Sequence, residues 1–284
     1  MNARTPQGLR DIFHYTGDSV SFLSAHRGGP EKNFPENCIA TFANTLKHTY
    51  SVMEMDPRFT RDSVIVVNHD PTLERTTTGH GRVADFTYKE LKELKLKDTE
   101  GNVTDYEIQT LREMLEWAKG KTILILDKKD VPIEFRIKMV EDCKAESCAI
   151  VMAYSFEEAK LAYSLNKDIM IQIFINGPDK IKEFDLTGVP WSNVLVSLGP
   201  KSPDDPAVFE MIHKRGALCK LGTVRSLDQD YISGKVADIN ELSDEYNALY
   251  RKGADFLETD IPVPVSRIVA NRLSSETFKS KFLK

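Results

Sequence analysis

The sequence predicts an α/β protein, a (β/α)8 TIM barrel, and two observations carry this prediction. Short apolar runs recur between helical segments, and each run is continuous rather than alternately polar and apolar. Continuous runs are typical of parallel strands that are buried on both faces. Eight such strand–helix units fit the roughly 250 residues of a TIM barrel. A doubly wound open sheet is the alternative fold, but the chain lacks a glycine-rich phosphate loop that opens a helix.

The length and composition are those of an ordinary globular protein. The chain has 284 residues, of which 41% are hydrophobic and 29% are charged. We expect an N-terminal arm or helix over residues 1–20 and a single barrel domain over residues 21–284. The net charge of −5 argues against nucleic acid as a partner, because a phosphate backbone requires a basic surface. No apolar window reaches the ~18 residues of a membrane-spanning segment.

The N-terminal segment and the cysteines bear on the compartment. Leu9, Ile12 and Phe13 form the apolar side of the expected N-terminal helix or arm. Because the segment lacks the apolar core of a secretory signal, we expect a cytoplasmic protein, or an exported one whose signal has been removed. The four cysteines show no CxxC spacing, which argues against a zinc or redox motif. Buried free thiols are favoured over a pairing of Cys143 with Cys148. The sequence does not predict an oligomeric state.

The first part of the chain supplies two barrel strands and an insertion. Strands are predicted over Ser21–His26 and Ser51–Asp56, with a helix over Pro35–Tyr50 between them. The Gly/Pro-rich loop Arg27–Pro35 is expected to lie close to a ligand. A further extended run, Val64–Val67, precedes His69, and the long polar segment at about residues 71–109 is interpreted as a small insertion that caps the site.

The rest of the chain is regular. Strands are predicted at Thr122–Leu126, Ala149–Ala153, Ile169–Ile175, Asn193–Ser197, Ala217–Val224 and Ala254–Thr259. Helices are predicted at Thr110–Lys119, Glu134–Lys144, Phe156–Leu165, near Lys180, at Pro206–Arg215 and Glu241–Lys252, and from near Pro264.

Polar side chains gather where these strands end. The active site of a TIM barrel lies at the carboxyl ends of its strands. In chain order, the residues that the sequence places there are His26, Arg27, Glu54, Asp56, His69, Asp70, Asp127, Lys129, Lys220, Glu258 and Asp260. The sequence therefore predicts one polar site, built from separate strands, at one mouth of the barrel.

Three of these residues are candidate metal ligands. Glu54 and Asp56 lie two apart on one strand face, and Asp127 follows a neighbouring strand. Three partly buried carboxylates repel one another unless their pKa values rise or a cation neutralises them. An all-oxygen ligand set suits Mg²⁺ or Ca²⁺. The alternative is that some of these acids simply pair with Lys129, Arg27 or Lys220.

Two histidines are candidates for proton transfer. His26 and His69 each adjoin a charged residue at a strand end, and imidazole titrates near neutral pH. Arg27 can bind a phosphate through two parallel hydrogen bonds. An arginine, a divalent ion and two histidines form a plausible site for cleaving a phosphodiester. The other histidines, His14, His48, His80 and His213, are expected to be structural.

The ordered motifs resemble those of a known family. They are His26-Arg27-Gly28, Pro35-Glu36-Asn37, Glu54-Met55-Asp56, His69-Asp70 followed by Arg75-Thr76-Thr77 and Gly79, and Thr259-Asp260-Ile261-Pro262. Together, from about Ala25 to Pro264, they resemble the glycerophosphodiester phosphodiesterases. The resemblance implies a TIM barrel with a small insertion after the second strand. It also implies metal-dependent hydrolysis of small-molecule glycerophosphodiesters to glycerol 3-phosphate and an alcohol.

The resemblance also implies roles for single residues. His26 and His69 match the acid/base pair, and we take His26 as the base and His69 as the acid. The attacking group is left open between water and the glycerol 2-hydroxyl. The family's metal ligands match Glu54, Asp56 and Asp127. Its residues around the phosphate match Arg27, Glu36 and Lys129.

The chain departs from the family pattern at three places. Cys38 stands where a threonine is usual, Asp127 where a glutamate is common, and Gly222-Thr223 where a Trp-Thr pair is usual. Loss of the tryptophan is expected to change substrate preference more than activity. Glu258 matches nothing in the family pattern.

Two other functions are weighed against this one. A barrel that binds a phosphate ester without cleaving it is disfavoured, because both histidines and all three candidate metal acids are present. A barrel that cleaves lysophospholipids or other phosphodiesters requires an apolar groove at its mouth. Four aromatic residues could line such a groove, namely Phe59, Phe86, Tyr88 and Tyr106.

Overall fold

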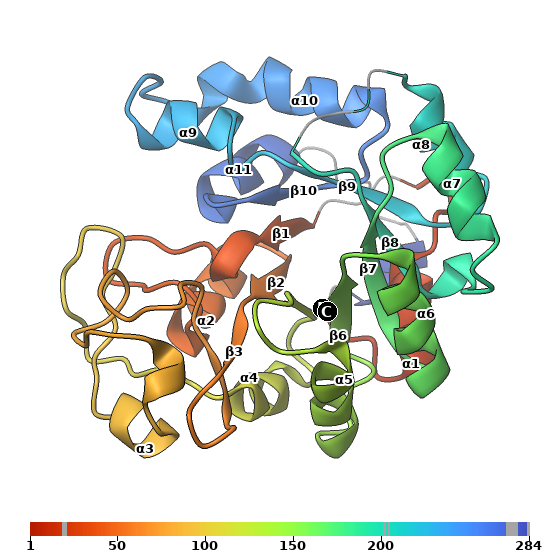
Figure 1. Ribbon diagram of the computed structural model, residues 1–284. Helices are drawn as coiled ribbons and strands as arrows, with labels where there is room; N and C mark the ends of the chain where they lie inside the picture. Colours follow the sequence, from red (N-terminus) through yellow and green to blue (C-terminus); the bar gives the residue numbers. More distant parts are fainter. Residues whose placement is uncertain (19–21, 201–202, 204, 271–277, 283–284) are drawn as a thin grey trace.

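Eight parallel strands close into a barrel. The computed structural model describes residues 1–18, 22–200, 203, 205–270 and 278–282. Around the barrel the order is β1, β2, β5, β6, β7, β8, β9 and β10, and β10 pairs with β1 (Figure 1). The strands are β1 (Leu23–Ala25), β2 (Ser51–Met55), β5 (Leu124–Leu126), β6 (Ala149–Ala153), β7 (Met170–Phe174), β8 (Val194–Ser197), β9 (Leu218–Gly222) and β10 (Phe256–Thr259). The predicted TIM barrel is confirmed, and the open-sheet alternative is wrong.

Helices follow the strands and cover the outside of the barrel. They are α2 (Ile39–His48), α4 (Leu111–Ala118), α5 (Ile133–Asp142), α6 (Phe156–Leu165), α7 (Pro178–Asp185), α8 (Ala207–His213), α10 (Ser243–Lys252) and α11 (Pro262–Val269). Their buried apolar faces pack on the outward side chains of the strands and form the main core. The short helix α9 (Leu227–Ile232), between β9 and α10, was not predicted.

The N-terminal segment forms helix α1 (Pro6–Phe13). Thr5 caps it by accepting a hydrogen bond from the backbone N–H of Gly8. Leu9, Ile12 and Phe13 are fully buried. The Phe13 ring packs on Phe22 and Phe256, with ring centroids 5.8 and 6.0 Å apart, at the amino ends of β1 and β10. Helix α1 therefore covers the end of the barrel opposite to the strand ends that carry the candidate site.

The segment 57–110 between β2 and β5 forms a lobe beside the barrel, drawn in orange to yellow in Figure 1. It contains an antiparallel pair, β3 (Pro57–Phe59) and β4 (Ile65–Val67), a 3₁₀ turn η2 (Val83–Asp85) and a one-turn helix α3 (Tyr88–Leu91). A small separate core holds it together, formed by Cys38, Val66, Leu73, Val83, Leu91, Leu96 and Ile108. Strand β3 was not predicted, because its sequence contains no apolar run.

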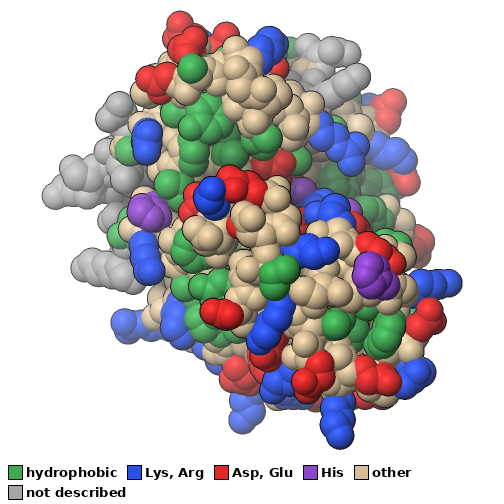
Figure 2. All heavy atoms as spheres, turned by 90° about the vertical axis from the view of Figure 1, so that its left-hand side faces the viewer, with side chains coloured by type: hydrophobic (Ala, Val, Ile, Leu, Met, Phe, Trp, Pro, Cys, Tyr) green, Lys and Arg blue, Asp and Glu red, His purple; other side chains and the backbone are tan. Residues whose placement is uncertain are grey.

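The surface of the lobe carries charges of both signs. Figure 2 shows Lys and Arg interspersed with Asp and Glu over this face of the molecule. Among the described residues on this face, basic side chains alternate with acidic ones.

Two predicted boundaries near the site are wrong. Helix α2 begins at Ile39 rather than Pro35, because Asn37 has a positive φ of 56° and is bonded to Asp56 instead of entering the helix. Strand β1 ends at Ala25, since His26 opens the 3₁₀ turn η1 (His26–Gly28). The predicted start of that strand, Ser21, lies outside the described residues.

Two expectations concern the chain as a whole. All four cysteines are free and buried, which confirms the preference for thiols over a Cys143–Cys148 disulfide. Within the described ranges, no helix has the length and apolar character needed to cross a membrane.

Candidate active site

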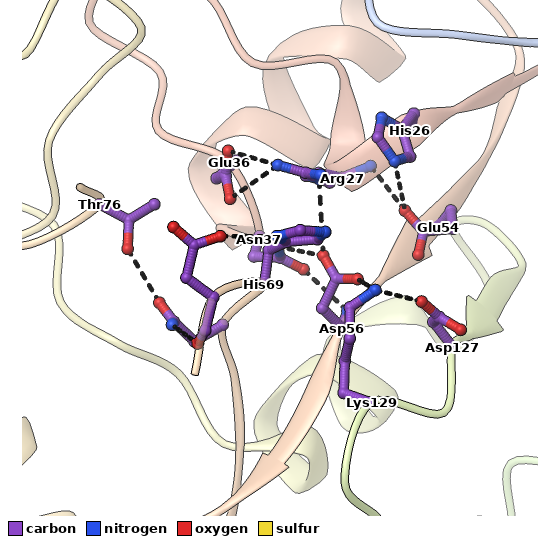
Figure 3. Close-up of polar contacts among 12 residues, drawn as sticks. His26, Arg27, Glu36, Asn37, Glu54, Asp56, His69, Thr76, Asp127 and Lys129 are labelled. Carbon is purple, nitrogen blue, oxygen red and sulfur yellow. Dashed lines mark hydrogen bonds and ion pairs between the residues drawn. The ribbon is translucent and has the colours of Figure 1, made fainter. Parts of the chain in front are cut away.

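A cavity of about 340 Å³ opens at the carboxyl ends of the barrel strands. Six of the predicted site residues line it, namely His26, Arg27, Glu54, His69, Asp127 and Lys129. Asp56 is fully buried beside them, and Glu36 is bonded to Arg27 (Figure 3). The structure thus brings together all eight residues that the sequence singled out.

The turn after β1 aims two of these residues into the cavity. Arg27 adopts a positive φ of 51°, and Gly28 follows with a φ of 88°. A Cβ at Gly28 would lie 2.2 Å from the ring of Phe42, so only glycine fits between the turn and α2. The backbone N–H of Arg27 donates to Oε2 of Glu54 at 2.9 Å. This hydrogen bond fixes the position of the turn relative to β2.

His26 is held by a carboxylate from the last strand. Its Nδ1 donates to Oδ1 of Asp260 at 2.6 Å, and its Nε2 lies 4.0 Å from Oε2 of Glu54. Burial on its own lowers the pKa of His26, but the hydrogen bond to Asp260 and the charges of Glu54 and Glu258 together raise it to about 9. In the metal-free chain His26 is therefore mostly protonated at neutral pH.

His69 comes from the lobe, and its pKa is shifted in the opposite direction. Its Nδ1 donates to Oδ1 of Asp70 at 2.7 Å, and Arg58 donates to its backbone carbonyl at 3.0 and 2.6 Å. Burial lowers the pKa of His69, and the positive charges of Arg27 and Lys129 add to this effect. His69 is therefore fixed in orientation and is mostly neutral at neutral pH.

Glu54, Asp56 and Asp127, named here the carboxylate cluster, bring ligand oxygens within 4.8 Å of one another. Burial raises the pKa of Glu54, and the neighbouring charge of Asp56 raises it further. Lys129 lies 2.9 Å from Oδ1 of Asp56 and also bonds Asp127, which accepts a second hydrogen bond from the Tyr154 hydroxyl. Although burial opposes the effect, Lys129 lowers the pKa of Asp127.

The donor set of the carboxylate cluster fits a hard divalent cation. All its ligand atoms are carboxylate oxygens, and all three residues are buried. Three adjacent buried carboxyl groups are costly to ionise together, and Lys129 pairs with only two of them. The residues present could therefore hold a metal ion.

Glu36 lies between two arginines. It accepts hydrogen bonds from Nη1 of Arg27 at 3.2 and 3.3 Å and from Arg75 at 2.8 Å on each oxygen. Arg75 also donates to Asp70 at 2.6 and 2.9 Å. Although burial opposes the effect, Arg75 and Arg27 lower the pKa of Glu36. Glu36 therefore acts on the site by orienting arginines, and the link through Arg75 reaches the partner of His69.

Sequence reasoning gave no role to several residues that shape the site. Arg75 stood within a quoted motif, and Asp260 was expected only as a polar strand end. Tyr154 follows β6 directly, so the rule that polar residues after strands enter the site would have found it. Lys220 was expected at the mouth but is 1% exposed and is paired with Glu258 inside the barrel.

The four aromatic residues considered for an apolar groove pack away from the cavity. Phe86, Tyr88 and Tyr106 pack on the core of the lobe, and Phe59 packs on Phe135 with ring centroids 5.4 Å apart. None of the four lines the cavity. Two other aromatic residues stand at its mouth, Tyr154 and Phe174.

Comparisons with known proteins agree with this geometry. The sequence model of the Glycerophosphoryl diester phosphodiesterase family matches residues 26–185, more than half of the chain. The glycerophosphodiester phosphodiesterase of Caldanaerobacter subterraneus is 35% identical over 147 residues, which cover 51% of this chain and 58% of that protein. The glycerophosphodiester phosphodiesterase 1 of Homo sapiens is 37% identical over 99 residues, 34% of this chain and 29% of that protein. The chain thus spans less than two thirds of these curated relatives.

Solved structures match over almost the whole chain. A glycerophosphoryl diester phosphodiesterase from Parabacteroides distasonis superimposes with a TM-score of 0.93 at 37% identity, covering 99% of this chain and 97% of that one. A glycerophosphodiester phosphodiesterase from Agrobacterium tumefaciens has a TM-score of 0.65 at 19% identity, covering 87% and 100%. The latter likeness shows the fold alone. Because the family model matches more than half of the chain and the Parabacteroides protein is 37% identical over almost all of it, this chain belongs to the glycerophosphoryl diester phosphodiesterase family.

Proposed function

We propose that this protein hydrolyses glycerophosphodiesters to glycerol 3-phosphate and an alcohol, with a divalent metal ion and a pair of histidines. One observation carries the proposal: His26 and His69, each bonded through Nδ1 to a carboxylate, line the same cavity as Glu54 and Asp127 of the carboxylate cluster. The family supports the reaction class. A related phosphodiesterase from Oleispira antarctica has been solved with the product sn-glycerol-3-phosphate.

The carboxylate cluster is the proposed metal site. Glu54, Asp56 and Asp127 would hold the ion, and their oxygen-only donor set suits Mg²⁺ or Ca²⁺. When bound, the ion would neutralise negative charge that develops on the phosphoryl oxygens.

Arg27 and Lys129 are the proposed phosphate-binding cations. The Nε of Arg27 has no hydrogen-bond partner among the described residues and lies 3.8 Å from Oδ2 of Asp56, while Glu36 holds its Nη1. Arg27 lines the cavity, so its guanidinium group is the proposed ligand of a phosphate oxygen. Lys129 lies at the edge of the carboxylate cluster and lines the same cavity. Glu36 positions Arg27 and is not itself a phosphate ligand.

His26 is the proposed base and His69 the proposed acid. Asp260 accepts the Nδ1 proton of His26, which leaves Nε2 as the proton acceptor. Glu54 is one cause of the high pKa of His26 in the metal-free chain, so a cation on Glu54 would favour the neutral base. His69 has a lowered pKa, which makes its protonated form a stronger donor to the leaving alcohol. The attacking oxygen belongs either to water or to the glycerol 2-hydroxyl.

The test is release of glycerol 3-phosphate from glycerophosphocholine and glycerophosphoethanolamine in Mg²⁺, in Ca²⁺ and in chelator. We expect metal-dependent release by the wild type and a loss of at least 100-fold in kcat for His69→Ala. His80→Ala is the matched control, because His80 is an exposed histidine of the same lobe outside the cavity. No release from either diester, or equal release in chelator, contradicts the proposal.

A further inference from the structure

One buried side chain of the barrel lacks the partners that buried polar groups normally have. Gln172 lies in β7 and is 1% exposed. Neither Nε2 nor Oε1 of its amide has a hydrogen-bond partner among the described residues. An unpaired buried amide costs free energy, so a polar group in this position calls for an explanation. Gln172 is among the residues that line the active-site cavity, so a bound molecule is a candidate partner for its amide.

Two more hydrogen-bonding side chains line the cavity. They are the hydroxyl of Ser197, at the end of the neighbouring strand β8, and the carboxylate of Glu258 in β10. Lys220 and Ser24 both donate to Oε2 of Glu258. Although burial opposes the effect, Lys220 lowers the pKa of Glu258 and keeps it ionised. An amide, a hydroxyl and a carboxylate together offer the donors and acceptors that bind alcohol hydroxyls.

The mouth of the cavity has a different character. Tyr154 and Phe174 are 51% and 39% exposed, and their ring centroids are 5.5 Å apart. Arg225 also lines the cavity, is exposed, and has no ion-pair partner among the described residues. The cavity therefore has an enclosed hydrogen-bonding end at Gln172 and Ser197, which is 4% exposed, and an open end at the two aromatic rings.

We propose that Gln172, assisted by Ser197 and Glu258, binds the terminal hydroxyl of the substrate's glycerol and so determines specificity for diesters with a free glycerol. This inference rests on the proposed function. Glycerol is the constant part of every glycerophosphodiester, and it suits the enclosed end. The leaving alcohol varies in size and charge, and it suits the open end. The hydroxyl on carbon 1 lies farthest from the phosphate and so reaches deepest, toward the Gln172 amide.

The selectivity follows from the unpaired amide. A substrate without the hydroxyl leaves the amide unsatisfied, so the site rejects it more strongly than a purely apolar pocket could. An acyl chain on the same oxygen removes its hydrogen and does not fit the enclosed end. The site is thereby directed toward deacylated diesters and away from lysophospholipids.

The test compares two substrates and two enzymes by choline release in Mg²⁺. The substrates are glycerophosphocholine and its analogue without the hydroxyl on carbon 1. This analogue keeps the 2-hydroxyl, so a lower rate does not reflect loss of an attacking group. Gln172→Met keeps the side-chain length and removes the hydrogen bonds. We expect the wild type to prefer glycerophosphocholine by roughly 10-fold in kcat/KM. We expect Gln172→Met to lose roughly 10-fold on glycerophosphocholine and less than about twofold on the analogue.

Thermal unfolding separates recognition from a structural role. Because the amide has no partners to lose, the unfolding midpoint of Gln172→Met should stay the same or rise. Asn193→Leu is the matched control: this buried amide donates to the carbonyls of Lys167 and Ile169, both at 2.9 Å. It should lower the midpoint and keep the wild-type preference between the two substrates.

The outcomes distinguish the two proposals. No turnover of either substrate by the wild type overturns the proposed function and this assignment with it. An active wild type whose preference is unchanged by Gln172→Met overturns the assignment alone. An equal loss on both substrates, or a lower midpoint without a change in preference, also overturns it, because either result indicates a structural side chain.

Discussion

The ammonium group of Lys129 lies 2.9 Å from Oδ1 of Asp56 and also bonds Asp127, so a lysine places positive charge at the edge of the carboxylate cluster. Lys129 holds this position with a positive φ of 38° in the turn after β5. In the metal-free chain, this side chain is the closest neutralising charge for two of the three candidate ligands.

The first prediction concerns this charge. Lys129→Met leaves Asp56 and Asp127 buried without their closest cation, and we expect the metal-free protein to lose about 3 kcal/mol of unfolding free energy. Saturating Mg²⁺ should restore part of it, because the ion supplies the missing positive charge. Urea unfolding in chelator and in Mg²⁺ measures both effects. Lys128→Met is the control, since Lys128 is 42% exposed and pairs with Glu158 outside the cluster. Equal losses in the two variants would contradict this reading.

The second prediction concerns metal affinity. Asp127→Asn keeps the shape of the side chain and removes one negative ligand, so Mg²⁺ affinity should fall at least 10-fold. Isothermal titration calorimetry checks this directly. Glu134→Gln, which changes an exposed carboxylate in the first turn of α5, should bind like the wild type. An unchanged affinity in Asp127→Asn would place the third ligand elsewhere.

The third prediction is a pH dependence of the metal-free protein. The pKa of His26 is raised from 6.5 to about 9, so its contribution to stability is present below pH 6.5 and is lost as pH rises through 9. Glu54 acts in the same direction, since its pKa is also raised. The stability should therefore fall by on the order of 3 kcal/mol between pH 6.5 and 9. Urea unfolding in chelator at several pH values measures the slope.

Two variants check the cause of this slope. Asp260→Asn removes the main interaction that raises the pKa of His26, and the slope should become shallower. His80→Gln should keep the wild-type slope, because His80 is exposed on the lobe. A wild-type slope in His26→Gln would rule out His26 as its source.

The fourth prediction concerns the arginine that links Glu36 to Asp70. Arg75→Met removes the hydrogen bonds from Arg75 to both carboxylates and so loosens the supports of Arg27 and His69. We expect kcat/KM for glycerophosphocholine to fall about 10-fold, with the larger part in kcat. Steady-state kinetics in Mg²⁺ measures the change. Arg61→Met is the control, because Arg61 is an exposed lobe arginine that pairs with Glu90. Equal kinetics in both variants would show that Arg75 is not a positioning residue.

The barrel could be predicted from the sequence because its strands are buried on both faces. Runs such as Thr122–Leu126 are apolar at every position after the first, and this leaves few alternatives to a parallel strand. The candidate site residues could be predicted for a related reason. A charged residue at the end of such a run, such as Asp127, is costly to bury without a partner or a function.

The remaining features depend on contacts between distant residues. Asn37 leaves the predicted helix because its side chain exchanges hydrogen bonds with Asp56, 19 residues away. Arg75 acquires its role only when the lobe brings it to Glu36. Gln172 interrupts an apolar strand, and the sequence does not show whether its amide finds a partner. Single-sequence patterns record periodicity and local turns, and they do not record such pairings.

The two histidines belong to different structural units, so we expect denaturant to affect turnover before it unfolds the barrel. His26 follows a barrel strand, whereas His69 follows β4 in the lobe, which has a small hydrophobic core of its own. A unit with a small core opens locally at a lower cost than the whole domain unfolds. Turnover should therefore disappear at lower denaturant concentration than the circular dichroism of the barrel. The protein would then pass through a stage in which the barrel is still folded and the two histidines proposed for proton transfer are no longer aligned.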